Sequence, residues 1–394
     1  MRNRAASAPA MAPVAAYRCV LMTMEDLHSR REAWLRLAAE AVEPNPFYEP
    51  DALIAAARYI EPGKLRAVAV WHGEDSEQRL AGLFPLQFGS IRQGLVAPLP
   101  SLYVNRMFSA SSAPLLWAED PEGVWEAFLR NLARLRRGGS LLLCPRMPLA
   151  RGAWRTLQAV IERQNLAHVE VSRYERPAVD STLSYDEYVA RYSGSQRKGM
   201  RRKLQMLEAE GDVTFHTVTD PGPEAAGAYA DFVALEAAGW KGAKGTALGR
   251  HDNTAAYGER LFGPAREADG VHYNVLAVSG RAVAVGVALV RQGVLFSAKS
   301  TYDESLSKAS PGRQLHLNVM RRTLDDKAYA RIDSCAGEEH SLSSFWLERE
   351  PIGTVLLATR PTVPRLYFES MLLAIRQTRR VREGAKALVK RLRH

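Results

Sequence analysis

Residues 294–320 read VLFSAKSTYDESLSKASPGRQLHLNVM, and their pattern gives the clearest indication of how the second half of the chain folds. Its apolar start, from Val294 to Phe296, is typical of a strand. Beyond Gly312, apolar residues recur at helical spacing, at Leu315, Val319, Met320 and Leu324. The pattern predicts a strand, a polar loop and a helix, with Ser310, Pro311 and Gly312 at the helix start.

The first turn of that helix is a candidate phosphate site. N–H groups at a helix start lack partners within the helix, and the aligned peptide dipoles add partial positive charge there. The backbone from Ser310 to Gly312 could therefore hold a pyrophosphate. A Ser-Pro-Gly sequence taken alone more often marks a plain turn, so the rest of the chain has to decide between the two.

Length and composition indicate a globular protein of two domains. The 394 residues exceed what one core usually covers, and 46% hydrophobic with 24% charged residues is an ordinary globular composition. No apolar run is long enough to predict a membrane-spanning helix. Residues 1–16 are rich in Ala and Pro, and Pro9 and Pro13 interrupt them, so we expect a disordered leader and not a secretion signal.

The cysteine pattern bears on compartment and on metal chemistry. Cys19, Cys144 and Cys335 are too few and too scattered for a disulfide framework or for paired metal-ligand spacing. The nine histidines are equally dispersed, so we expect no metal site. These features favour a reducing cytoplasm.

Most of the net charge of +10 lies at the C-terminal end. From Arg376 onward there are eight Lys or Arg residues and one Glu, a net of +7, which leaves +3 for the rest of the chain. A nearly neutral body makes nucleic acid an unexpected partner. Residues 366–394 are predicted to form a basic helical tail with an apolar stripe at Val381, Ala385, Leu388 and Leu392, which either lies on anionic lipid or is solvated.

Two stretches about two hundred residues apart share one plan. In the first, predicted strands at 65–70 and 80–88 precede a helix at 124–135 and a strand at 141–143. In the second, strands at 273–278 and 282–290 precede a helix at 314–326 and a strand at 329–332. Both halves are therefore predicted to be one α/β unit used twice, with a boundary after Pro177, where Tyr174 to Ser181 shows little periodicity.

Two helices are predicted to open the second half. Tyr185, Tyr188 and Tyr192 fall near one face of the first, most simply as core residues. The second runs over 195–210, with Ser195 as N-cap, Gly211 as its stop and a buried stripe of Met200, Leu204 and Leu207.

That second helix carries five cations between Arg197 and Lys203. Like charges on one helix repel each other, so they form either a solvated face or a basic wall for phosphates or an acidic acceptor. We take Arg197 and Arg201 as candidate contacts for that ligand.

Two polar segments are candidate ligand contacts. Trp240, Lys241 and Gly242 stand among several glycines, which suggests either a backbone shaped for close approach to a ligand or an ordinary connection. Lys299, Tyr302 and Asp303 end the strand before the Ser-Pro-Gly loop, and ligands in α/β folds bind just outside strand ends. Asp303 could accept a proton, anchor an ammonium or simply cap the loop, and Tyr302 could donate a proton to a leaving group.

A further polar segment follows the last predicted strand of the second half. Asp333, Ser334 and Cys335 end the strand, and Glu338, Glu339 and His340 come next. A Cys-His nucleophile is disfavoured because no third group is present to orient the His. Glu338 and His340 remain second candidates for accepting a proton.

Taken together, these motifs resemble the cellulose-biosynthesis branch of the GNAT acyltransferase superfamily, most clearly over residues 180–350. The resemblance rests on Trp240-Lys241-Gly242 with Gly245-Thr246, Lys299 with Tyr302-Asp303, Ser310-Pro311-Gly312, Asp333, Trp346 and the basic helix from Arg197 to Leu207. It implies an α/β (α+β) fold of two tandem GNAT-like domains, each a mixed, mostly antiparallel sheet flanked by helices, as in the related Fem aminoacyl transferases. The domains would span 17–177 and 178–365.

The resemblance also implies the donor and its site. An acyl-CoA, by first choice acetyl-CoA, would place its pyrophosphate at Ser310, Pro311, Gly312, Arg313 and Gln314, with Lys299 as a further donor contact. Trp240, Lys241, Gly242, Arg197, Arg201, Asp333 and Trp346 would contact substrate. The first half has Ser111, Ser112 and Pro114 in a similar place but no Gly entering its helix at Val124, so only the second half is expected to bind donor.

Such an enzyme would transfer the acyl group by direct attack of an amine or hydroxyl on the thioester. The acceptor could be a small molecule, a glycan or a cell-envelope precursor, reached through peripheral contact of the tail with the inner face of the membrane. Two other functions stay open, namely a tRNA-dependent aminoacyl transferase of Fem type and a non-enzymatic membrane-surface or assembly factor.

Overall fold

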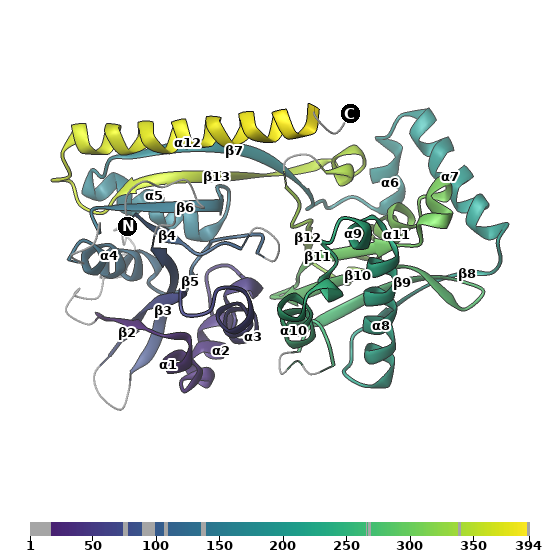
Figure 1. Ribbon diagram of the computed structural model, residues 1–394, viewed down its shortest axis with the longest axis horizontal. Helices are drawn as coiled ribbons and strands as arrows, with labels where there is room; N and C mark the ends of the chain where they lie inside the picture. Colours follow the sequence, from purple (N-terminus) through teal and green to yellow (C-terminus); the bar gives the residue numbers. More distant parts are fainter. Residues whose placement is uncertain are drawn as a thin grey trace, which may run out of the picture.

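The computed structural model describes residues 17–73, 78–88, 99–105, 109–134, 139–264, 266, 269–337 and 340–391. The expected leader, residues 1–16, lies outside this part of the chain. Two lobes lie side by side, and the long C-terminal helix runs along the top of the molecule in Figure 1.

One mixed sheet runs through both lobes. Over the described residues, thirteen strands join in the order β1-β2-β3-β4-β6-β13-β7-β12-β11-β10-β9-β8, with β5 paired to β3. The pairs β4–β6 and β11–β12 are parallel and the other described pairs are antiparallel. The strands are β1 (Tyr17–Met22), β2 (Arg66–His72), β3 (Arg79–Phe88), β4 (Pro100–Leu102), β5 (Leu115–Leu116), β6 (Leu141–Pro148), β7 (His168–Val179), β8 (Val213–Val218), β9 (Val271–Val278), β10 (Arg281–Arg291), β11 (Val294–Tyr302), β12 (Arg331–Asp333) and β13 (Glu348–Ala358).

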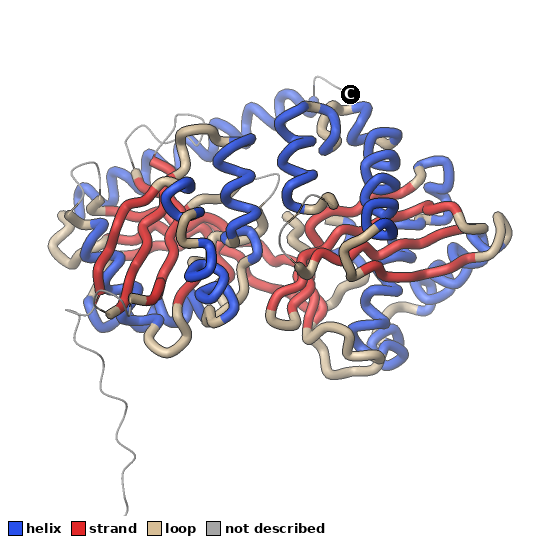
Figure 2. The backbone as a smooth tube through the Cα atoms, turned by 90° about the horizontal axis from the view of Figure 1, so that it is seen from below, coloured by secondary structure: helices blue, strands red, loops and turns tan. Residues whose placement is uncertain are grey.

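Helices cover the sheet on both faces (Figure 2). The alternation along β2 shows why: Val68 and Val70 belong to one buried cluster, and Ala67 and Ala69 to another on the opposite face. In the first half the helices are α1 (Met24–His28), α2 (Arg31–Ala39), η2 (Pro46–Tyr48), α3 (Pro50–Ala55), η3 (Ala56–Ile60), α4 (Pro121–Leu132) and α5 (Gly152–Gln164). In the second half they are α6 (Tyr185–Ala190), α7 (Gly194–Glu208), α8 (Pro223–Ala238), α9 (Trp240–Ala243), η6 (Leu248–Arg250), α10 (Asp252–Leu261), η7 (Glu304–Ala309), α11 (Pro311–Leu324), η8 (Ser341–Ser344) and α12 (Arg365–Arg391).

The predicted fold class is confirmed, with shifts at element ends. Both predicted hairpins form, as β2–β3 and β9–β10. Helix α4 begins at Pro121, earlier than predicted, because the Asp120 carboxylate accepts the Gly123 N–H and caps the helix there. Strand β12 is confined to 331–333.

The last strand of the second half lies in the sheet of the first half. Strand β13 pairs with β6 on one side and along nearly its whole length with β7 on the other. The boundary predicted after Pro177 therefore lies inside β7, and the weak periodicity of 174–181 does not mark a linker. Strands β7 and β13 run together across the top of the molecule in Figure 1, and they join the halves into one sheet.

The two lobes also share an apolar core. Phe47 of η2 meets Phe296 of β11 edge to face, with ring centroids 6.2 Å apart. Beside them, the single Nε–H of Arg291 is shared between the two carboxylate oxygens of Glu49, each 2.7 Å from Nε. Burying these groups together fixes how the lobes meet.

Helices α6 and α7 behave partly as predicted. The tyrosine stripe is core, since Tyr188 and Tyr192 are buried in one cluster. Helix α7 is capped by Ser193 and not by Ser195, because the Ser193 hydroxyl accepts the Gln196 N–H while the Gln196 side chain accepts the Ser193 N–H. The helix ends at Glu208, before the predicted stop at Gly211.

The basic tail is helical as predicted, and its first half is a packed part of the fold. Phe368, Met371 and Ile375 of α12 are buried against a cluster that includes Leu143 and Leu356 of the sheet. The opposite face remains exposed at Leu366, Leu373 and Val381. Among the described residues, no helix combines the length and apolar character needed to cross a bilayer.

Candidate functional site

The candidate site is built where the parallel strands β11 and β12 diverge. Their pairing covers three residues, ending at Phe296 opposite Asp333. Strand β11 continues to Tyr302, whereas β12 stops. The register between β10 and β11 also shifts just after Phe296, where β11 holds one extra residue. The divergence leaves one edge of β11 from Ser297 onward without a paired strand in the described sheet.

The predicted Ser-Pro-Gly loop follows directly. Ser310 has a left-handed backbone (φ 52°), and Pro311 is the first residue of α11. The Arg313 and Gln314 N–H groups both donate to the Ser310 carbonyl. Since Pro311 has no N–H, Gly312 offers the first-turn N–H that remains for a ligand. A Cβ at Gly312 would stand 3.2 Å from the Tyr302 ring, so the glycine lets this strand end approach closely.

Two cations stand beside this helix start. The Lys203 Nζ of α7 donates to the Ser310 hydroxyl at 2.7 Å. The Arg313 guanidinium lies 4.6 Å from the centroid of the Phe345 ring, and its buried Nε has no partner. Burial and the neighbouring Arg313 lower the pKa of Lys203, which is the effect expected where an anion would relieve the repulsion.

Other residues that were predicted to bind acyl-CoA or an anionic ligand make contacts within the protein or face solvent. The Gln314 amide donates to the Met200 carbonyl and ties α11 to α7. The Arg197 guanidinium donates to the carbonyls of Ala190 and Tyr192, which lie at the end of α6. Arg201 is exposed on α7. Of the basic helix, it is Lys203 that the fold brings to the loop.

A buried charged cluster lies on the opposite side of β11. The Lys241 Nζ donates to Glu236 Oε1 at 2.8 Å and to the Ser300 carbonyl at 3.0 Å. The other Glu236 oxygen accepts the Leu248 N–H at 2.6 Å. Burial lowers the pKa of the nearby Lys299 to about 8, although Glu236 opposes the shift. Lys299 is thus charged at neutral pH and close to releasing its proton.

The Trp-Lys-Gly segment is a short helix and not an open loop. Gly242 is required by packing, since a Cβ there would stand 1.8 Å from the Ala237 carbonyl oxygen. The Trp240 side chain is half exposed. The backbone N–H of Trp240 donates to the Glu304 carboxylate at 2.6 Å. The bond links α9 to η7, so the segment borders the donor loop.

Asp303 is a cap. It accepts the N–H and hydroxyl of Ser305 and pairs with Arg281 at 2.7 Å. The hydrogen bond from the Ser305 hydroxyl, aided by Arg281, lowers the pKa of Asp303. A carboxylate held in this way is a weak proton acceptor, so of the roles predicted for Asp303 the structure supports capping.

The predicted site residues at the end of β12 and beyond it mainly make contacts that hold the fold together. Asp333 is buried and pairs with Arg176 at 3.2 Å. His340 caps η8 by accepting the Leu342 N–H at Nδ1, which places the proton of the neutral ring on Nε2. Burial lowers the pKa of His340. Burial and Asp333 raise the pKa of Cys335, which keeps its thiol protonated. Glu338 lies outside the described residues.

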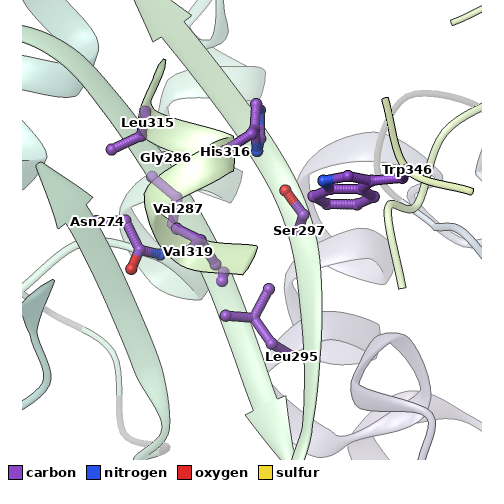
Figure 3. A pocket seen from close by; sticks show the side chains of 10 residues that line it. Asn274, Gly286, Val287, Leu295, Ser297, Leu315, His316, Val319 and Trp346 are labelled. Carbon is purple, nitrogen blue, oxygen red and sulfur yellow. The ribbon is translucent and has the colours of Figure 1, made fainter. Parts of the chain in front are cut away.

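Trp346, which was predicted to contact substrate, lines a cavity with Ser297 at the open edge of β11. Its ring is fully buried and meets His316 of α11 at a right angle, with ring centroids 5.6 Å apart. The His316 Nε2 lies 3.3 Å from the Ser300 hydroxyl. A small cavity opens between these residues and Ser297 (Figure 3).

Several site residues escaped the sequence-based prediction. Glu236, His316 and Ser297 belong to none of the motifs recognised in the sequence. Lys203 was recognised only as one of five cations. Lys203 differs from the other four cations because it contacts Ser310, and that contact depends on how α7 packs against η7 and α11.

A comparison with protein-family models matches the part of the chain that contains the candidate site. Residues 194–340 match a family model described as an acetyltransferase (GNAT) domain. None of the curated proteins compared with the chain matches it. The matching segment contains α7, the diverging strands and the loop.

Solved structures share the fold of most of the chain at low sequence identity. The C-terminal domain (DUF2156) of a putative lysylphosphatidylglycerol synthetase from Agrobacterium fabrum is 12% identical, with a TM-score of 0.52 and coverage of 89% of this chain and 96% of that one. FemX is 8% identical, with a TM-score of 0.50 and coverage of 83% and 95%. The chain thus shares its fold with these two structures, and its residues 194–340 match an acetyltransferase (GNAT) domain.

Proposed function

We propose that the protein is an acyltransferase that moves an acyl group, by first choice acetyl, from acyl-CoA to an amine or hydroxyl. The observation that carries the proposal is the diverging pair β11–β12, followed by a helix start whose free Gly312 N–H stands beside Lys203 and Arg313. A pyrophosphate there would accept the N–H and be paired with two cations.

The chemistry is a direct displacement. The acceptor's lone pair forms a bond to the thioester carbonyl carbon, the C–S bond breaks, and the CoA thiolate leaves. Lys299 replaces Asp303 as our candidate for taking the acceptor's proton. Burial lowers the pKa of its amine to about 8, so the deprotonated fraction that can accept a proton grows as the pH rises from neutral. Tyr302, beside Gly312, remains the candidate proton donor to the thiolate.

The acceptor side is formed by α8 and α9. Trp240 is exposed there, and the Lys241–Glu236 pair lies behind it. The resemblance to the cellulose-biosynthesis branch supports a glycan or cell-envelope acceptor, and the exposed apolar residues of α12 support one held at a membrane surface.

Acyl-CoA binding tests the proposal. Acetyl-CoA is expected to raise the melting temperature of the full chain, and Gly312→Glu to abolish the shift, because a carboxylate at the helix start repels pyrophosphate. Lys203→Met is expected to weaken binding about tenfold, through loss of a charge-assisted contact.

Gly227→Glu is the matched control, since Gly227 is exposed on α8 with nothing within 4 Å of its would-be Cβ. It should retain the full shift. If a panel of acyl-CoAs gives no shift while aminoacyl-tRNA does, the donor is a charged tRNA and the proposal fails.

A further inference from the structure

The indole N–H of Trp346 is a buried hydrogen-bond donor without an acceptor. The side chain is completely buried, yet its Nε1 has no hydrogen-bond partner. Leaving a buried N–H unpaired destabilises the fold, because its hydration is lost without a replacement. Such a group in a native fold calls for a ligand or a water that the N–H serves.

The N–H faces a small cavity. Its lining includes Ser297, Leu295, His316, Val319 and Trp346, and the space open to the centre of a water-sized sphere is about 10 Å³. In Figure 3 the indole nitrogen is on the side of the ring turned toward Ser297. A space of this size holds a single oxygen-sized group.

The position of the cavity relates it to acyl transfer. Ser297 directly follows Phe296, the last residue of β11 that pairs with β12, so the cavity adjoins the open strand edge. His316 lies one helical turn beyond Gly312 on α11. Burial lowers the pKa of His316 to about 4, so the imidazole is neutral at physiological pH and adds no charge to the cavity.

We propose that this cavity receives the carbonyl oxygen of the acyl thioester, with the Trp346 indole N–H as its hydrogen-bond donor. The inference rests on the proposed function. When the acceptor bonds to the carbonyl carbon, an electron pair moves onto this oxygen, and it returns as the C–S bond breaks. A fixed donor in a water-excluded site stabilises that developing charge.

Binding measurements test the oxygen site without knowledge of the acceptor. Acetyl-CoA carries the carbonyl, S-ethyl-CoA has a methylene in its place, and CoA has neither. Wild-type protein is expected to bind acetyl-CoA about five- to tenfold more tightly than S-ethyl-CoA, because one hydrogen bond contributes about this factor to the binding constant. Equal affinities for the two would overturn the inference.

Two variants assign the donor. Trp346→Phe keeps the ring and removes the N–H, so the preference for acetyl-CoA should vanish while CoA itself binds as before. Val319→Ile places one more carbon beside the cavity and should have the same effect, which keeps the test usable if Trp346→Phe does not fold. Retention of the preference in both variants would mean that the cavity holds only a structural water.

Trp125→Phe is the matched control. Trp125 is fully buried in the first half and donates from Nε1 to the Ala153 carbonyl at 3.2 Å. Its loss should leave the preference intact. If neither CoA nor acetyl-CoA binds to the wild-type protein, the proposed function itself fails, which is a different outcome from binding without a preference.

Discussion

Arg176 of β7 and Asp333 of β12 form a buried ion pair, with Arg176 Nη1 3.2 Å from Asp333 Oδ2. The same guanidinium donates to the Ala110 carbonyl of the first half at 2.6 Å and to the Ala336 carbonyl of the second at 3.2 Å. Burial acts to raise the pKa of Asp333, but Arg176, Arg331 and the Cys335 N–H together hold the pKa below its usual value. Asp333 thus helps to join the halves beside the open strand edge, a role that its position after a strand did not indicate.

Breaking this pair should destabilise the protein strongly. Arg176→Met leaves the Asp333 carboxylate buried without its cation, and we expect a loss of about 3–5 kcal/mol in the free energy of unfolding, measured by urea denaturation. Arg173→Met is the control, because the Arg173–Glu175 pair is exposed and should contribute less than about 1 kcal/mol. Equal effects of the two changes would show that the buried pair has no special role.

Gly242 should tolerate no side chain. We expect Gly242→Ala to lower the free energy of unfolding by about 1–3 kcal/mol, because the Cβ would overlap the Ala237 carbonyl and force α9 away from α8. Gly227→Ala on the open face of α8 should instead stabilise by up to about 1 kcal/mol. A neutral Gly242→Ala would indicate that α9 shifts freely and that Gly242 serves a ligand instead.

Lys299 should make stability depend on pH in the alkaline range. Its pKa is about 8 in the folded protein, against about 10.4 in an unfolded chain. Between these values the unfolded state binds more protons, so the contribution of Lys299 to stability rises with pH. Wild-type protein should therefore gain about 1–3 kcal/mol relative to Lys299→Met between pH 7.5 and 10.5.

The measurement is the melting temperature of both proteins across that pH range. Lys308→Met, at an exposed lysine of η7, is the control and should give a constant difference from wild type. A constant difference for Lys299→Met as well would remove the case for Lys299 as the proton acceptor.

The outer face of α12 should bind anionic lipid. Leu366, Leu373 and Val381 are 80%, 57% and 71% exposed and two turns apart, and Arg376 and Arg380 lie among them. We expect flotation of the full chain with phosphatidylglycerol vesicles and not with phosphatidylcholine vesicles, lost in L366S/L373S/V381S.

L21S/L35S removes exposed leucines elsewhere and should leave flotation unchanged. Flotation that persists in the α12 triple variant would place the lipid contact on another surface. Absence of flotation in the wild type would leave α12 as a helix that only covers the sheet.

Much of the fold could be predicted from local patterns. The β2–β3 and β9–β10 hairpins and helices α4, α7 and α11 follow from periodicity and turn residues, which depend on neighbouring positions. The predicted boundary after Pro177 failed to separate the halves because β13 pairs with β6 and β7, and strand pairing between distant segments leaves no local trace.

The site divides in the same way. Local residue types were enough to predict a strand, a loop with Gly312 and a helix start in that order, because backbone geometry depends on neighbouring positions. Which polar side chains meet there depends on how distant segments pack. That packing made Asp303 a cap, Asp333 half of an ion pair and Gln314 a link between helices, and it brought Lys203 and Trp346 to the site. Burial and the partners found across the fold set these roles, and neither is a property of local sequence.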